Sequence, residues 1–217
     1  MKTTSVFFIF LLLIIIPGPY THAQNTKNKL QINGTRFEMN GEHFEYTGVS
    51  FFNAIYNDEF NKNSQVRKAW MQKFLDSGIN VLRVWCQWDM RRGFIDSGEG
   101  KTIFKKDGTI KPEQLNTIKA ILQDADEKEM VILLVIFSRE SWNENLRLSD
   151  QASDRGVSIL AKELQPYGNL VFQIWNEFDY RTVEYYQKIK EADPQRIVTN
   201  SPGYAGVLGS VNENVTL

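Results

Sequence analysis

The stretch that most constrains the fold is residues 170–179, which read Leu-Val-Phe-Gln-Ile-Trp-Asn-Glu-Phe-Asp. An almost unbroken apolar run of this length is typical of a parallel strand that is buried on both faces in an α/β fold. Ligands and catalytic groups in such folds gather at the carboxyl ends of the strands. The run therefore predicts that Asn176 and Glu177, which follow it directly, lie at a functional site.

Strand-like apolar runs alternate with helical patterns along most of the chain. Strands are expected over about 46–51, 81–86, 131–137, 170–175 and 197–200, and helices over about 64–77, 112–125, 154–164 and 182–192. Ser64 is expected to cap the first of these helices, and Gly78 to end it. Such alternation implies a parallel sheet with right-handed crossovers, either an eight-fold barrel or a doubly wound open sheet. No Gly-x-Gly-x-x-Gly follows the first strand, so a nucleotide-binding open sheet loses its main support.

Three shorter strand candidates precede this alternation, at 30–32, 36–39 and 44–47. Asn33-Gly34 and Asn40-Gly41 separate them and are strong tight-turn signals. The N-terminal part is therefore expected to form a small β-hairpin that leads into the first strand of the sheet.

The length of the chain bears on the choice between the two architectures. A closed (β/α)8 TIM barrel needs about 250 residues, whereas this chain has 217 and shows no strand pattern after the fifth strand. The expected fold class is therefore α/β, a (β/α)8 barrel truncated after about its fifth strand.

Residues 1–23 read as a secretory signal peptide. Lys2 supplies the positive charge, Val6–Ile16 is apolar, and Thr21-His22-Ala23 offers a small-x-small cleavage site. We therefore expect residues 24–217 to be a partial catalytic domain that is secreted, extracellular or periplasmic, and free of the membrane after signal removal.

Composition excludes several classes of partner. The chain has 25 basic and 26 acidic side chains, a balance that does not favour nucleic acid or an anionic membrane surface. The single cysteine, Cys86, excludes an intramolecular disulfide framework and a multi-cysteine zinc site. The two histidines leave little for a histidine-based metal site. Cys86 is expected to be a buried apolar thiol. No metal and no cofactor is expected, and the protein is expected to be a monomer.

Alternation along the second strand assigns a direction to Arg83. Val81, Arg83 and Trp85 share one face, and the intervening residues share the other. A charged side chain within an apolar strand is costly unless it is paired. Arg83 is therefore expected to point into the barrel toward acidic groups at its mouth, with a structural carboxylate as the alternative partner.

The same alternation places Gln173, Trp175 and Glu177 on one face of the fourth strand. A carboxyl surrounded by Trp175 and apolar neighbours would lose water, which raises its pKa and lets it act as a general acid near neutral pH. Asn176 can both donate and accept a hydrogen bond with a substrate hydroxyl. The alternative is that Glu177 has a structural role only, as a carboxylate whose negative charge stabilises the N-terminus of the next helix.

Three motifs now carry a family resemblance. Trp175-Asn176-Glu177 resembles the Asn-Glu motif of the clan-A glycoside hydrolases, especially the cellulase and mannanase family numbered five. Residues 77–85, Ser-Gly-Ile-Asn-Val-Leu-Arg-Val-Trp, resemble its second strand, and residues 46–52 resemble its first. The likeness extends from about Leu30 to Ser201. It implies a (β/α)8 barrel that hydrolyses β-linked polysaccharide with retention of configuration.

The resemblance also implies roles for individual residues. Glu177 would be the acid/base, Asn176 would bind the 2-hydroxyl of the substrate, and Arg83 would support the active-site carboxylates. Retention needs a second carboxylate about 5–5.5 Å from the first, which the family places on the seventh strand, so these 217 residues alone are expected to be inactive. The third strand ends Ile136-Phe-Ser-Arg139, where many relatives carry a histidine, so the subfamily stays open.

Aromatic side chains are the other half of a sugar site, because sugar faces pack on rings. Trp88, Trp142, Phe52 and Tyr56 follow strand ends and are expected to line subsites, with loop packing as the alternative. The resulting prediction is a secreted hydrolase of β-1,4-linked mannan or glucan. The alternatives are a non-catalytic carbohydrate-binding barrel and an unrelated α/β barrel or open-sheet enzyme.

Overall fold

The structure is a computed structural model that describes residues 26–89, 98 and 100–201. The predicted signal peptide, residues 1–23, lies outside the described residues. The strands are β1 (Leu30–Asn33), β2 (Arg36–Met39), β3 (Glu42–His43), β4 (Gly48–Ser50), β5 (Val81–Trp85), β6 (Val131–Ser138), β7 (Leu170–Asn176) and β8 (Val198–Thr199). The helices are α1 (Ser64–Asp76), α2 (Pro112–Asp126), α3 (Arg139–Ser141), α4 (Asp150–Glu163) and α5 (Thr182–Ala192), with short turns η1 (Ala54–Tyr56), η2 (Phe60–Lys62) and η3 (Trp142–Leu146).

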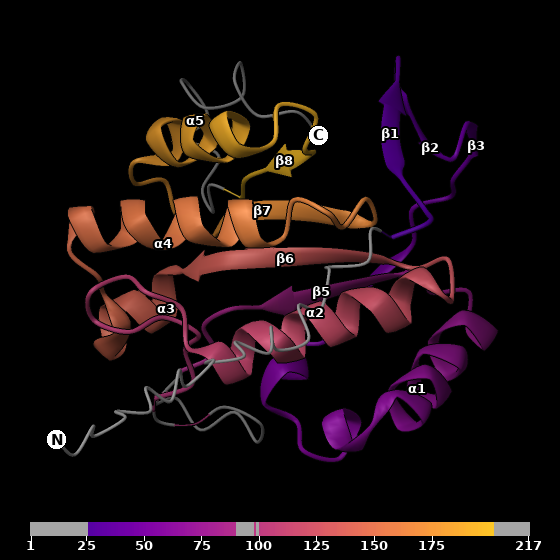
Figure 1. The fold of residues 1–217 in the computed structure, drawn as a ribbon, viewed down its shortest axis with the longest axis horizontal. Coiled ribbons are helices and arrows are strands. Elements are labelled where there is room, and N and C mark those ends of the chain that lie inside the picture. Colours follow the sequence, from indigo (N-terminus) through magenta and orange to yellow (C-terminus); the bar gives the residue numbers. More distant parts are fainter. Residues whose placement is uncertain (1–25, 90–97, 99, 202–217) are drawn as a thin grey trace, which may run out of the picture.

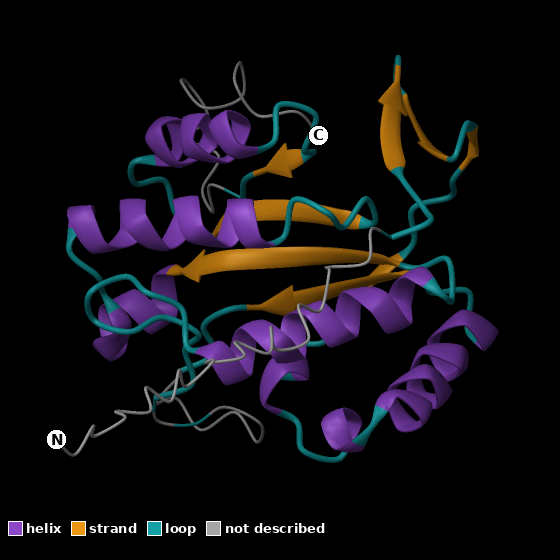
Figure 2. Ribbon diagram, in the orientation of Figure 1, coloured by secondary structure: helices purple, strands orange, loops and turns teal. Residues whose placement is uncertain are grey.

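The central element is a five-stranded sheet in the order β4-β5-β6-β7-β8, in which every neighbouring pair is parallel. A helix follows each of the first four strands before the next begins, and helices run alongside the strands in Figure 2. The spatial order repeats the chain order without a reversal, as in a β/α barrel, whereas a doubly wound sheet reverses at its switch point. The prediction of a parallel α/β fold built as part of a barrel is confirmed.

The two faces of this sheet pack against different partners. Leu82, Val84, Ile132 and Leu134 belong to the large core that includes the buried faces of the helices. The residues between them on each strand face the other way, as the period of two requires. Cys86 lies in the helix-side core, where it is fully buried with a free thiol, so that prediction is confirmed.

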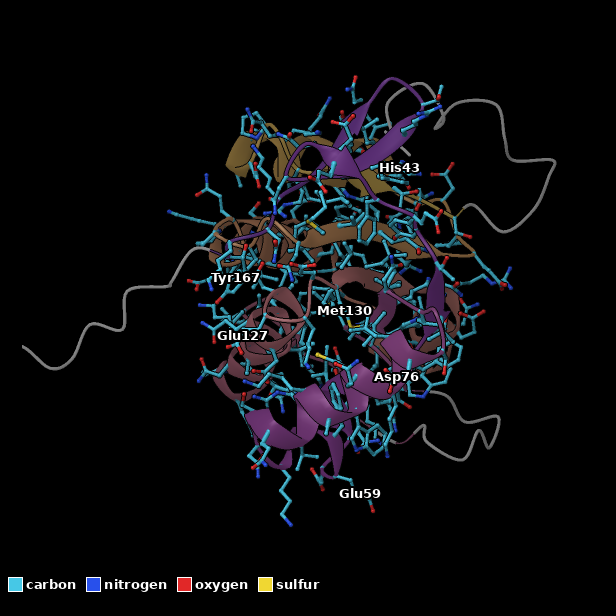
Figure 3. All side chains as sticks on the ribbon, turned by 90° about the vertical axis from the view of Figure 1, so that its right-hand side faces the viewer. His43, Glu59, Asp76, Glu127, Met130 and Tyr167 are labelled. Atoms are coloured by element: carbon cyan, nitrogen blue, oxygen red, sulfur yellow. The ribbon has the colours of Figure 1, made fainter. Side chains whose placement is uncertain are left out.

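A second, antiparallel sheet of β1, β2 and β3 covers the amino-terminal ends of the parallel strands. In Figure 1 the arrowheads of β5 and β6 point toward α3, and β1–β3 lie at the opposite end. Leu30 and neighbouring apolar side chains of this sheet pack on Val81, Val131 and Val171. Figure 3 looks onto this end, with Met130, the residue before β6, near the centre and His43 of β3 above it.

Several predicted boundaries shift because local hydrogen bonds decide them. The third short strand is Glu42–His43 instead of 44–47. Asn63, not Ser64, caps α1, since its side chain accepts a hydrogen bond from the Val66 amide at 2.9 Å. Helix α4 begins four residues earlier than predicted, because Ser149 caps it.

Candidate active site

The site is organised by the carboxyl ends of β5, β6 and β7, which meet at one edge of the sheet. The register pairs Ser138, the last residue of β6, with Asn176, the last residue of β7. Residues that follow these two strands are therefore brought side by side although 38 positions separate them. Polar side chains of β4, β5 and β7 and of the turn after β6 converge here.

Arg83 lies at the centre of this convergence. Its Nε donates to Gln173 Oε1 at 2.9 Å, one terminal nitrogen donates to Asn176 Oδ1 at 2.9 Å, and the other donates to Ser50 Oγ at 3.3 Å. Burial lowers the pKa of Arg83 from its ordinary value, and the negative charge of Glu177 opposes that shift. Arg83 points to the inner side of the sheet as expected, but its hydrogen-bond partners are two amides and a hydroxyl. The carboxylates of Glu177 and Glu140 act on its pKa through their charge.

The amide of Asn176 is held at both ends. Its Oδ1 accepts from Arg83, and its Nδ2 donates to a carboxylate oxygen of Glu140 at 3.3 Å. The side chain therefore has a defined orientation, with one N–H left for a further acceptor.

The end of β7 departs from the regular alternation of a strand. Gln173 and Asn176 both contact Arg83 although they are three positions apart. Between them, the ring of Trp175 is fully buried in the helix-side core. The Trp175 carbonyl accepts bonds from the Gln173 side chain at 2.6 Å and the Ser201 amide at 3.2 Å, which fix this irregular end.

Glu177 follows directly and has φ = 51°, in the left-handed region that residues other than glycine rarely adopt. Such strained backbone is stable only where the surroundings enforce it, and it clusters at functional sites. The Glu177 side chain is 51% exposed and lies 3.4 Å from a guanidinium nitrogen of Arg139. The prediction that Trp175 shields this carboxyl from water is wrong, because the strand end turns the ring to the helix side.

Two site residues, Arg139 and Glu140, were missed by the sequence reasoning. They form the short turn α3 directly after β6, and the 13% exposed Glu140 side chain lies 3.8 Å from Arg139. Among the described residues, the site thus combines two arginines and two glutamates. The sequence did carry a signal for them. Ser-Arg-Glu follows the third apolar run directly, just as Asn-Glu follows the apolar run of the next strand.

Part of the predicted aromatic lining lies beside Arg83. The rings of Phe52 and Trp88 stack at 4.5 Å, and both pack on Trp85, over which the Arg83 guanidinium lies at 4.7 Å. Phe52 is partly exposed, while Trp88 is 4% exposed. The Tyr56 hydroxyl donates to the Cys86 carbonyl at 2.6 Å, and burial raises the pKa of Tyr56 well above its ordinary value. Their roles toward a ligand stay predictions.

Trp142 does not fit its predicted place in a sugar subsite. Only 5% of the residue is exposed, and its ring packs edge-on against Phe137 and Trp175 at 5.2 and 4.8 Å. The turn that follows β6 folds this ring back into the helix-side core instead of toward the sheet edge.

The described part of the chain holds no group of three or more potential metal ligands and no helix that is long and apolar enough to cross a membrane. Two of its cavities, of about 470 and 640 Å³, lie toward the opposite end of the strands and are lined by none of the predicted site residues. The converged carboxylates, amide and guanidinium groups can donate protons, accept protons and hydrogen-bond hydroxyl groups.

Comparison with known families and structures adds to this geometry. A family model described as Cellulase (glycosyl hydrolase family 5) matches residues 37–214. The search of curated proteins found no match.

Solved structures resemble the chain at low sequence identity. A β-1,4-D-mannanase from Cryptopygus antarcticus superposes with a TM-score of 0.58 at 17% identity over 80% of this chain and 61% of its own. An endo-1,4-β-mannanase from Rhizomucor miehei gives 0.58 at 12% identity over 87% and 66%. A family 5 glycoside hydrolase from Bacteroides vulgatus gives 0.59 at 17% over 79% and 39%. The chain thus spans less than two thirds of the length of each, and the likeness supports the barrel fold.

Proposed function

The chain belongs to glycosyl hydrolase family 5, and from this premise we propose that the whole protein is a secreted enzyme that hydrolyses β-1,4-linked polysaccharide with retention of configuration. The observation that carries the proposal is the hydrogen-bonded series Gln173, Arg83 and Asn176, with Glu177 next to it, at the carboxyl end of the sheet. In β/α barrels this end is where catalytic residues gather.

Glu177 is the proposed acid/base. It first protonates the leaving glycosidic oxygen, and after a glycosyl-enzyme has formed it removes a proton from the attacking water. Half of its side chain is open to solvent, so a substrate can reach the carboxyl. Arg139, at 3.4 Å, is in a position to stabilise the carboxylate that remains after the first proton transfer.

Asn176 is the proposed ligand of the substrate 2-hydroxyl. Hydrogen bonds to this hydroxyl strengthen as the transition state forms, and they supply several kcal/mol in glycoside hydrolysis. Arg83 fixes the Asn176 amide through its Oδ1 and places a positive charge near the acidic groups.

The retaining reaction needs a second carboxylate as nucleophile, about 5–5.5 Å from the first. We place this nucleophile outside the described residues, on a later strand of the whole protein.

β-Mannan is the first substrate to test, with β-glucan second. Two of the solved structures similar to this chain are β-1,4-mannanases by description, and the family description is cellulase. The apolar run and cleavage-like site within residues 1–23 support export of the protein to the extracellular or periplasmic space.

The test is release of reducing sugar from β-mannan and cellulose by the whole protein, together with the anomeric configuration of the first product by proton NMR. Glu177→Gln should lower kcat by about 10²–10⁴-fold with an unchanged melting temperature. Glu184→Gln, at a half-exposed glutamate on α5, is the matched control and should leave kcat unchanged.

Near-wild-type turnover of Glu177→Gln would contradict the assignment of the acid/base. Inverted product would contradict retention. Tight binding of mannan without any release of sugar would favour a non-catalytic carbohydrate-binding barrel instead.

A further inference from the structure

We propose that Glu140 is a positioning residue that fixes the orientation of the Asn176 amide, so that one Asn176 N–H is aimed at the substrate 2-hydroxyl. The inference rests on the proposed function for its catalytic consequence. Its structural part is that the Glu140 carboxylate orients the Asn176 amide, and this part depends only on contacts among the described residues.

The place of Glu140 is fixed by its local structure. Ser138 caps the turn that carries Glu140, since its Oγ accepts from the Ser141 amide at 3.1 Å. The two serine hydroxyls also bond each other at 2.9 Å, and both residues are fully buried. Because Ser138 is paired with Asn176 across β6 and β7, this turn delivers Glu140 to the side of Asn176.

The Asn176 amide has two possible orientations, and its neighbours select one. In the observed orientation its oxygen faces a donor of Arg83 at 2.9 Å, and its nitrogen faces a carboxylate oxygen of Glu140 at 3.3 Å. A flipped amide would set N–H against guanidinium and oxygen against carboxylate, so it would lose both bonds. Arg83 disfavours the flip through the amide oxygen, and Glu140 adds a second bond that also fixes the amide nitrogen.

Glu140 also faces the other charged groups of the site. Arg139 lies 3.8 Å from Glu140 and 3.4 Å from Glu177. The negative charges of both carboxylates raise the pKa of Arg83 against the effect of its burial. The two roles of Glu140, hydrogen-bond acceptor and negative charge, can be separated by substitution. Glu140→Gln would keep an acceptor for Asn176 Nδ2 without the charge, and Glu140→Ala would keep neither.

The kinetic test uses the whole protein. Glu140→Ala should lower kcat/KM by up to about 100-fold, mainly through kcat, because the 2-hydroxyl bond strengthens in the transition state. Glu140→Gln should recover most of this loss. In the background of Asn176→Ala, Glu140→Ala should have almost no further effect, since its route of action is already removed.

Glu163→Ala, at a partly exposed glutamate on α4 that pairs with Lys119, is the matched control and should behave as wild type. Additive losses in the double variant would overturn the inference, because Glu140 would then act independently of Asn176. Complete loss in Glu140→Gln would also overturn it and would indicate a catalytic role for the charge itself.

A second measurement does not depend on activity. In the ¹⁵N-labelled whole protein, the side-chain NH₂ signals of Asn176, assigned by their loss in Asn176→Ala, should shift in Glu140→Ala and stay in place in Glu163→Ala. Unshifted signals in Glu140→Ala would overturn the inference even if the enzyme is active. If the whole protein is inactive but the signals shift, the proposed function fails while the positioning contact holds.

Discussion

The two ends of the inner sheet face differ in composition although the same three strands build both. At the amino-terminal end, Val81, Val131 and Val171 form an apolar layer that is at most 3% exposed and packs under the β1–β3 sheet. At the carboxyl end, Arg83 and the polar residues of β7 form a hydrogen-bonded group that is partly open to solvent.

Under the proposed function, one layer of strands serves stability at one end and chemistry at the other. Strand residues on one face are about 6.6 Å apart, so Arg83 lies one step from Val81. The apolar end gains free energy from burial, and the polar end carries the cost of partly buried charge and of the strained backbone at Glu177. Substitutions at the two ends should therefore separate folding from activity.

The largest change in stability should come from introducing a charged side chain, typical of the polar end, into the apolar layer. Val131→Asp would bury an unpaired carboxylate at a fully buried position of the apolar layer and should lower the free energy of unfolding by more than about 4 kcal/mol. Urea denaturation measures this change. Val49→Asp, at a 36% exposed position of β4, is the control and should change stability little. Equal losses of unfolding free energy in Val131→Asp and Val49→Asp would contradict the view that burial in the apolar layer decides the effect.

The converse substitution makes the polar end apolar. Arg83→Met removes three hydrogen bonds and leaves the acceptor oxygens of Gln173 and Asn176 without their partner. We expect kcat/KM of the whole protein to fall by about 100-fold, and the free energy of unfolding to fall by only about 1–3 kcal/mol. Arg36→Met, at an exposed position of β2, should alter neither quantity. Wild-type kinetics in Arg83→Met would contradict the proposal that Arg83 contributes to activity.

A smaller effect is expected at Gln173, which links Arg83 to the irregular end of β7. Gln173→Leu removes the acceptor of Arg83 Nε and the donor to the Trp175 carbonyl, at about 1 kcal/mol for each bond. Activity should fall by less than in Arg83→Met, and steady-state kinetics will show whether it does. The exposed Gln123→Leu on α2 serves as control. A larger loss than in Arg83→Met would mean that the strand end, not the arginine, organises the site.

The smallest expected effect concerns Tyr46, which packs against the apolar layer at the amino-terminal end. Burial raises its pKa from 10.0 to about 12, and the positive charge of Arg83 opposes this rise. Because the folded state holds the proton more tightly, this contribution to stability is complete below pH 10 and is lost as the pH rises toward 12. In Arg83→Met the pKa of Tyr46 should rise further. An ultraviolet titration of tyrosinate, compared with Tyr46→Phe, measures the shift, and a lower pKa would contradict it.

The fold was largely predictable because its determinants are local. The apolar runs and turn residues gave all five parallel strands, and regular alternation along β5 gave the inward direction of Arg83. Prediction failed where the regular period ends. Trp175 turns to the helix side because bonds from Gln173 and Ser201 hold an irregular strand end. Trp142 is buried because its ring packs on Phe137 of the strand that precedes it and on Trp175 of the next strand.

The sequence by itself determined where each parallel strand ends to within one residue, and so most of the side chains that lie near the polar edge of the sheet, because a period of two and a turn residue act within a few positions. Only the tertiary structure decided which of them meet. The register of β6 on β7 brings Glu140 to Asn176 and Arg139 to Glu177. That register depends on packing over the whole sheet, and no local pattern encodes it.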